Sequence, residues 1–153
     1  MRKPGRQEEG QRTNDNAGVN DERTSRQTES RLEHGELTEK IIGAAIEVHR
    51  SLGPGFLESI YENALILELQ KRQLRVAQQT EFPVTYAGQE VGRHRLDLLV
   101  EDTIVVELKC AKDLEDVHFA IVRSYLRACG KRHGLLLNFA KPTLEVRRVI
   151  APA

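Results

Sequence analysis

Three side chains that could perform metal or acid–base chemistry lie within one stretch of 13 residues: Asp97, Glu107 and Lys109. They belong to the run RLDLLVEDTIVVELK, residues 95–109, and apolar residues flank each of them. Burying a charged side chain among apolar ones costs free energy unless a partner or a cation compensates for it. The run therefore predicts a cluster in which these charges meet.

A hairpin is the element that would bring the three together. Residues 91–100 and 103–110 have the composition of strands, and Glu101-Asp102-Thr103 is a three-residue connection between them. This connection pairs Asp97 with Glu107, and directly opposed Cβ atoms of an antiparallel pair are about 4.5–5.5 Å apart. Lys109 shares their face, because alternate strand residues point the same way. The opposite face is entirely apolar, with Leu98, Val100, Ile104, Val106 and Leu108.

Two adjacent carboxylates repel each other unless a proton or cation lies between them. Carboxylate oxygens are hard ligands that suit Mg²⁺ or Mn²⁺. A cation held there could polarise a phosphoryl oxygen and acidify a bound water, and Lys109 could orient that water or stabilise the charge that develops. This is the chemistry of phosphodiester hydrolysis. The alternative is a structural ion-pair cluster with no catalytic role.

The surrounding pattern predicts the order α-α-β-β-β-α-β-β. Helical periodicity runs from Leu37 to Leu52 and stops at Gly53-Pro54-Gly55. The second helix is expected at about 57–73, with a stripe of Ile60, Ala64, Leu65, Leu67 and Leu69. Strands are expected at 76–86, 91–100, 103–110, 133–139 and 144–150, and a helix, capped by Asp113 and ended by Gly130, at 114–129. Pro83 suggests an edge strand or a bulge.

Residues 1–35 are expected to form a disordered tail, because they contain almost nothing apolar to bury. One domain is then expected over residues 36–153. No apolar run is as long as a membrane span and no signal peptide is visible, so the chain is predicted to be cytoplasmic, without a membrane partner. The two cysteines are too far apart for a CxxC motif and are expected to be reduced thiols.

The formal net charge is zero, which does not indicate a strongly basic nucleic-acid binder. A local basic face could still contact phosphates. Arg123, Arg127 and Lys131 recur at intervals of four and would form one stripe on a helix. Such a stripe is either a solvated face or a set of phosphate contacts for DNA or RNA.

Several motifs together resemble one known family. The run GFLESIY, residues 55–61, matches the motif of the GxxExxY proteins, and AAIEVHRSLGPGFLESIYE, RLDLLVEDTIVVELK and GLLLNF are similar to that family as well. The resemblance covers roughly residues 36–150 and implies membership of the PD-(D/E)xK nuclease superfamily. The implied fold is an α/β, restriction-endonuclease-like αβββαβ core with a mixed sheet flanked by helices. This chain would add one helix in front and one strand behind.

The resemblance also implies roles for residues. Asp97 and Glu107 would be metal ligands and catalytic groups, and Lys109 the catalytic lysine. Glu58 would be a further acidic residue that contributes directly or through water, although a Glu near a helix N-terminus is favoured in any case. Tyr61, three residues later on the same helical face, would bond within the site or cap its edge.

Four further positions bear on the same site. Related nucleases often carry a Gln four residues before a Tyr on the helix that follows the Lys; here Tyr125 is present and the Gln position is Ile121. His118 matches a His frequent in the family, or is an ordinary helix residue. Gly55 fits loop geometry first and a backbone contact with phosphate second.

Two functions compete at this point. The first is a Mg²⁺- or Mn²⁺-dependent nuclease that acts on DNA or RNA. The second is a non-catalytic module with the nuclease fold that binds nucleic acid or protein, which Ile121 and the neutral charge favour. A homo-oligomer formed through the first helix is a further option.

Overall fold

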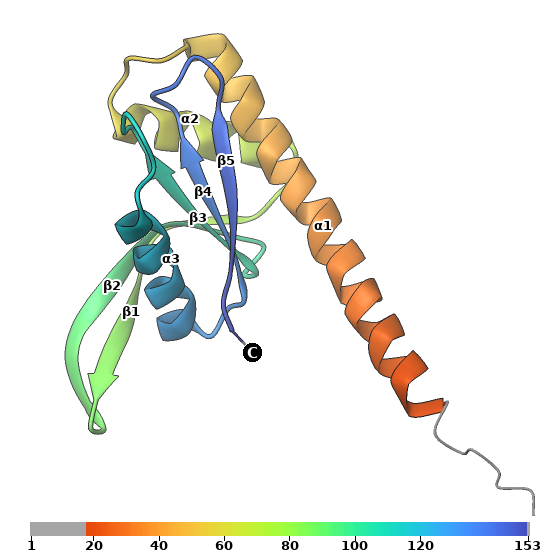
Figure 1. Cartoon of the computed structure of the whole chain (residues 1–153). Coiled ribbons are helices and arrows are strands. Elements are labelled where there is room, and N and C mark those ends of the chain that lie inside the picture. Colours follow the sequence, from red (N-terminus) through yellow and green to blue (C-terminus); the bar gives the residue numbers. More distant parts are fainter. Residues whose placement is uncertain (1–17, 153) are drawn as a thin grey trace, which may run out of the picture. The chain divides into compact units, whose positions relative to one another are not determined.

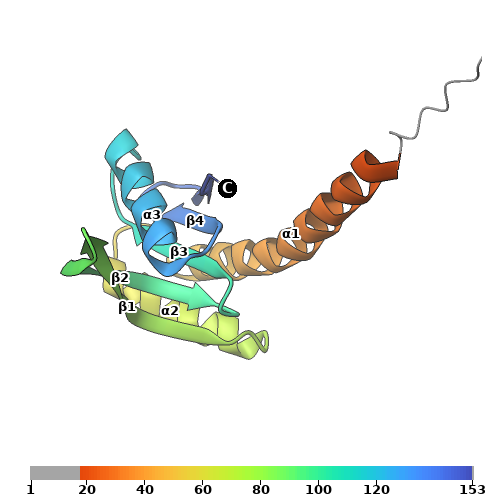
Figure 2. The same ribbon diagram turned by 90° about the horizontal axis from the view of Figure 1, so that it is seen from below.

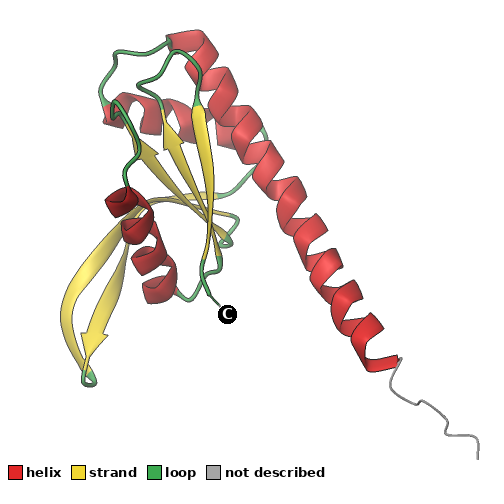
Figure 3. Ribbon diagram, in the orientation of Figure 1, coloured by secondary structure: helices red, strands yellow, loops and turns green. Residues whose placement is uncertain are grey.

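The computed structural model describes the backbone of residues 18–152 and the side chains of residues 34–152. The chain divides into two compact parts, residues 1–36 and residues 37–153. The order of elements is the predicted one (Figures 1 and 3). The elements are α1 (Gly18–Leu52), α2 (Glu58–Lys71), β1 (Val76–Tyr86), β2 (Gln89–Val100), β3 (Ile104–Lys109), α3 (Asp116–Cys129), β4 (His133–Asn138) and β5 (Glu145–Ile150).

Helix α1 begins at Gly18, well before the expected start near Glu36. The segment 18–35 contains three Glu and three Arg, which have high intrinsic helix propensity even where no apolar stripe is present. The lack of apolar residues alone therefore does not predict where α1 begins. Residues 1–17, the rest of the predicted tail, lie outside the described residues.

The five strands form one mixed sheet in the order β1-β2-β3-β4-β5. Only β3 and β4 are parallel, and α3 is the crossover between them. The edge position expected from Pro83 is confirmed, because β1 is an edge strand, and its pairing with β2 shifts between Val84 and Thr85. The sheet lies between α2 on one face and α3 on the other (Figure 2).

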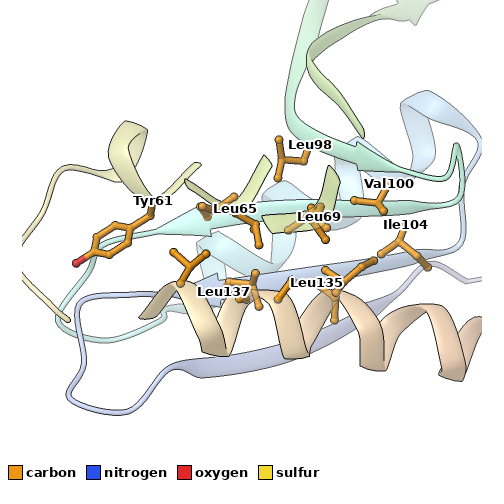
Figure 4. Packing of buried hydrophobic residues seen from close by; sticks show 14 of the residues in the cluster. Tyr61, Leu65, Leu69, Leu98, Val100, Ile104, Leu135 and Leu137 are labelled. Atoms are coloured by element: carbon orange, nitrogen blue, oxygen red, sulfur yellow. The ribbon is translucent and has the colours of Figure 1, made fainter. Parts of the chain in front are cut away.

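Strand alternation divides the core into two layers. Leu98, Val100 and Ile104 pack with α1 and α2 on one face (Figure 4). Leu99 and Val105 pack with α3 on the other. The apolar face predicted for the hairpin is therefore the one that holds α1 and α2, and the face of Asp97 and Glu107 is the one beneath α3.

Two details of the helices differ from the prediction. In α2 the buried side chains are Tyr61, Glu62, Leu65 and Leu69, whereas Ile60 and Leu67 of the expected stripe are exposed. Helix α3 starts at Asp116 with Glu115 as its N-cap, not Asp113. Gly130 ends α3 as predicted, in the left-handed conformation at φ 69°.

Both cysteines are free and half-buried, as expected. No helix in the described part of the chain combines the length and apolar character needed to cross a membrane.

Candidate metal and catalytic site

The β2–β3 hairpin has the register that the three-residue connection predicted. Leu98 pairs with Val106, and Val100 pairs with Ile104. The regular pairing stops there, but the backbone N–H of Leu108 donates to Oδ2 of Asp97 at 3.0 Å. This bond holds the Asp97 carboxylate against the backbone next to Glu107, although the predicted Asp97–Glu107 pair is not part of the regular ladder.

Glu107 is the most constrained ionisable side chain of the site. It is only 5% exposed. Its Oε2 atom is buried and has no hydrogen-bond partner among the described residues. Burial, followed by the negative charge of Asp97, raises the pKa of Glu107 to about 8, and the charge of Lys109 offsets only part of this. A buried carboxylate oxygen without a donor is an acceptor for a proton or a cation.

Asp97 is half-buried, and burial also raises its pKa, against the lowering effect of the Leu108 N–H. The charge of Glu62 raises it further. Glu62 was not singled out from the sequence; it is buried on α2 and accepts hydrogen bonds from Nε2 of Gln78 at 3.1 Å and of Gln79 at 2.7 Å. The charge of Glu62 thus acts on Asp97, and the charge of Asp97 in turn acts on Glu107.

Lys109 supplies the positive charge at the end of β3. Its charge lowers the pKa of Asp97, Glu107 and Glu58. Its backbone is fixed by the parallel pairing with Asn138 and by the bond from the N–H of Phe139 to its carbonyl at 2.9 Å. The predicted trio is therefore electrostatically coupled.

Asn138 is a residue that sequence reasoning missed. It is fully buried at the end of β4. Its Oδ1 accepts from the N–H of Ala111 at 3.1 Å, and its Nδ2 donates to the carbonyl of Ala111 at 2.7 Å. These bonds fix the chain just beyond Lys109, so Asn138 positions the lysine rather than reacting. The run GLLLNF contains it, but only the fold shows what it contacts.

Glu58 is the first residue of α2 and points toward the same end of β3. Burial raises its pKa, while the charge of Lys109 and the backbone N–H of Cys110 lower it. Within the described residues, however, no group of three or more His, Cys, Asp or Glu side chains is arranged to hold a metal ion. The pair Asp97 and Glu107 is the compact part of the predicted ligand set, and Glu58 is its neighbour.

Gly55 lies in the loop before α2, and Tyr61 lies in the first turn of α2 and contacts that loop. Tyr61 is fully buried, stacks on Phe139 with ring centroids 4.6 Å apart, and donates its hydroxyl hydrogen to the carbonyl of Gly53. The same hydroxyl accepts from the N–H of Phe56 at 3.2 Å. Gly55 has φ 110°, which side chains rarely tolerate. The GxxExxY motif thus fixes this loop and the direction of Glu58.

The two candidates on α3 have different environments. Tyr125 is half-buried, its ring packs against that of His94 on β2 with centroids 4.7 Å apart, and its pKa is raised by burial and then by the charges of Glu107 and Asp97. His118 instead accepts the N–H of Glu115 through Nδ1 at 2.9 Å, in a capping box at the start of α3. In the structure His118 therefore takes part in this cap.

Arg123, Arg127 and Lys131, the predicted basic stripe, lie on the wall of one groove together with Arg132. Asp97 and Glu107 do not line it. The basic stripe is therefore separate from the carboxylate site.

With this geometry in hand, the chain can be compared with known proteins. The family model described as the PD-(D/E)XK nuclease superfamily matches residues 35–149, which is most of the chain. Curated proteins give no match.

Solved structures resemble this fold at low sequence identity. The crystal structure of SSO0001 has a TM-score of 0.51 and 17% identity, and the match covers 62% of this chain and 50% of that one. An alkaline exonuclease, LHK-Exo from Laribacter hongkongensis, has a TM-score of 0.47 and 14% identity, with 61% and 56% covered. The chain thus spans about half the length of these proteins. The predicted α/β, restriction-endonuclease-like architecture is confirmed.

Proposed function

We propose that this chain, which belongs to the PD-(D/E)XK nuclease superfamily, is a divalent-metal-dependent phosphodiesterase that cleaves DNA or RNA. The observation that carries the proposal is the buried Oε2 of Glu107, which has no partner among the described residues and lies beside a second carboxylate. The run of residues 55–61 leads us to place the chain in the GxxExxY group within that superfamily, and to expect it in the cytoplasm.

The donor set fits Mg²⁺ or Mn²⁺. Such ions are usually held by one or two carboxylates, with water and substrate phosphate oxygens completing the coordination. Asp97 and Glu107 would supply the carboxylates, and Glu58 would act through water. A bound ion would polarise a phosphate oxygen and acidify a nearby water. It would also relieve the repulsion that raises the pKa of Glu107.

Lys109 has the complementary role in this proposal. Its ammonium group carries three hydrogen-bond donors and no acceptor, so it can hold a phosphate oxygen and stabilise the negative charge that develops there. Asn138 keeps the backbone on either side in place. Tyr125 would close the α3 side of the Asp97–Glu107 pair, because the charges of both carboxylates raise the pKa of its hydroxyl.

The deciding experiment measures cleavage of plasmid DNA, single-stranded DNA and RNA with Mg²⁺, with Mn²⁺ and with EDTA. We expect metal-dependent cleavage by the wild type and a loss of about 100-fold or more in Lys109→Ala, since removing one group that stabilises transition-state charge has an effect of that order. Asp97→Ala should lose metal binding as well. Equal trace cleavage by wild type and Lys109→Ala in every metal would refute the proposal.

A non-catalytic nuclease-fold module is the second candidate, and Ile121 favours it. Ile121 and Tyr125 are four residues apart, so an apolar side chain shares the helix face that approaches the carboxylates. Calorimetric titration with Mn²⁺ separates the two. Absent Mn²⁺ binding, together with tight binding of nucleic acid or protein, would favour the module. Sedimentation at several concentrations would test the homo-oligomer.

A further inference from the structure

A groove of about 800 Å³ runs between α3 and the residues that follow β5. Four of its ten lining residues are cationic and none is acidic: Arg123, Arg127, Lys131 and Arg132. Ala151 and Pro152 form part of the opposite wall. We call this the basic groove. Its composition contrasts with that of the whole chain, which has zero net charge.

The cations of the basic groove are mostly uncompensated. Arg123, Arg127 and Arg132 are exposed, and within residues 34–152 none of them forms an ion pair. Lys131 contacts Asp102 at 3.4 Å, but the Asp102 side chain is 81% exposed, so solvent screens that pair. By contrast, Arg93 and Arg95 on the β1–β2 hairpin each pair with a glutamate.

Fixed backbone holds the groove open. The left-handed Gly130 ends α3, and the N–H of Lys131 bonds to the carbonyl of Leu126 at 3.1 Å. The N–H of Ala151 bonds to the carbonyl of Arg132 at 2.8 Å and joins the two walls. Cations are favoured at a helix C-terminus in general, but that effect fades within the last turn. It accounts for Arg127 and not for Arg123.

The basic groove and the carboxylate pair lie on different sides of α3. Helix residues two positions apart are separated by about 200° around the axis, because one turn takes about 3.6 residues. The ring of Tyr125 packs against that of His94 on β2, with centroids 4.7 Å apart, so Arg123 and Arg127 project the other way, into the groove. The groove and the carboxylate pair therefore lie on different sides of α3, and neither Asp97 nor Glu107 lines the groove.

We propose that the basic groove binds the sugar–phosphate backbone of nucleic acid, at a site distinct from the carboxylate pair. Arg and Lys contacts to phosphate set the position of a strand without reading its sequence. A strand held there would wrap around one end of α3 to reach Lys109. This last step rests on the proposed function, whereas binding in the groove does not depend on cleavage.

The test is fluorescence anisotropy with labelled single-stranded DNA, duplex DNA and RNA, in EDTA to prevent cleavage. The variant is Arg123→Ala with Arg127→Ala. Each lost phosphate contact should lower the slope of log K against log salt by about 0.9, or about two for the pair. The difference between wild-type and variant affinity should therefore change about tenfold between 50 and 200 mM KCl.

Two matched pairs serve as controls. Arg93→Ala with Arg95→Ala removes the same charge from cations that already have partners, and should change affinity less than the groove pair does. Arg123→Lys with Arg127→Lys keeps the charge and should retain most of the binding. All six substitutions are of exposed side chains and should leave the melting temperature unchanged.

The outcomes separate this inference from the proposed function. Equal affinity and salt dependence for wild type and groove variant would overturn the groove as a phosphate site. Tighter binding of poly-glutamate than of the oligonucleotides at equal charge concentration would assign the groove to acidic proteins instead. Groove-dependent binding without cleavage in any metal would sustain this inference and refute only the proposed function.

Discussion

Glu107 gives the fold a pH dependence that can be measured without any substrate. Its pKa is about 8 in the folded chain against a usual value of 4.5, because the site is buried and Asp97 is negative. A raised carboxyl pKa means that the folded state binds the proton more tightly than the unfolded state. The associated stability is present below pH 4.5 and is lost as the pH rises to about 8.

We therefore expect the free energy of unfolding of the wild type to fall between pH 5 and pH 8. The fall should be at most about 5 kcal/mol, since one pKa unit corresponds to about 1.4 kcal/mol. Glu107→Gln should remove most of this slope, because the amide carries no charge. Urea unfolding at pH 5 and at pH 8 measures this change in free energy. Adding Mn²⁺ at pH 8 should bring the stability of the wild type back toward its value at pH 5.

Glu90→Gln is the matched control, because Glu90 is exposed on the hairpin and lies far along β2 from the pair. The free energy of unfolding of Glu90→Gln should fall with pH as steeply as that of the wild type. If the free energy of unfolding fell equally with pH in the wild type and in Glu107→Gln, a group other than Glu107 would titrate between pH 5 and pH 8.

The sequence could predict Asp97, Glu107 and Lys109 because all three lie on one hairpin, whose register follows from counting residues. It could not predict Asn138, which reaches the same place through the α3 crossover and the parallel pairing with Lys109. The sequence could not predict the contribution of Glu62 for a related reason. Its influence on Asp97 depends on how α2 lies against the sheet.

At the scale of elements, His118 contributes to the cap at the start of α3. His118→Ala removes the acceptor for the N–H of Glu115. We expect the free energy of unfolding to fall by about 1 kcal/mol, the usual effect of losing a helix cap. Mn²⁺ affinity and cleavage should remain at wild-type levels when measured well below the melting temperature. Loss of cleavage at unchanged stability would instead indicate that His118 takes part in function.

Gly134 controls how closely α3 packs on β4. A Cβ atom at this position would lie 2.9 Å from Cγ1 of Val122, which is fully buried. Gly134→Ala should therefore push α3 outward and cost about 1–3 kcal/mol, as overpacking of a core does. It should also weaken Mn²⁺ binding, because Tyr125 moves with α3.

Gly92→Ala is the control for that substitution. Gly92 lies on β2, where an added Cβ meets nothing within 4 Å. Its stability should stay the same or rise slightly, because alanine reduces the freedom of the unfolded chain. If Gly134→Ala were equally harmless, α3 would not pack on β4 as closely as described.

Helix α2 shows the limit of periodicity as a guide to burial. Its apolar residues surround most of the helix axis, so the sequence offered more than one stripe. The fold selected Tyr61, Leu65 and Leu69, and left Leu67 exposed. That choice was made by contacts with α1 and the sheet, which no local pattern contains. The strands were easier to predict because Gly, Pro and charged turns bound them.

On the scale of the whole molecule, charge is distributed rather than absent. The 23 basic and 23 acidic residues cancel. Acidic groups gather at the carboxylate site, and unpaired arginines gather in the basic groove. Long-range attraction of nucleic acid is therefore weak, and binding depends on local contacts within about 8–10 Å at physiological salt.

The last prediction concerns residues 1–33. Among the described residues, burial begins at Thr38 and Ile41, and the family match begins at residue 35. Deleting residues 1–33 should therefore leave metal binding unchanged and shift the melting temperature by less than about 4 °C, which corresponds to roughly 1 kcal/mol for a domain of this size. Scanning calorimetry measures the shift. A larger loss would mean that residues before Thr38 stabilise the domain, and its boundary would then have to move toward the N-terminus.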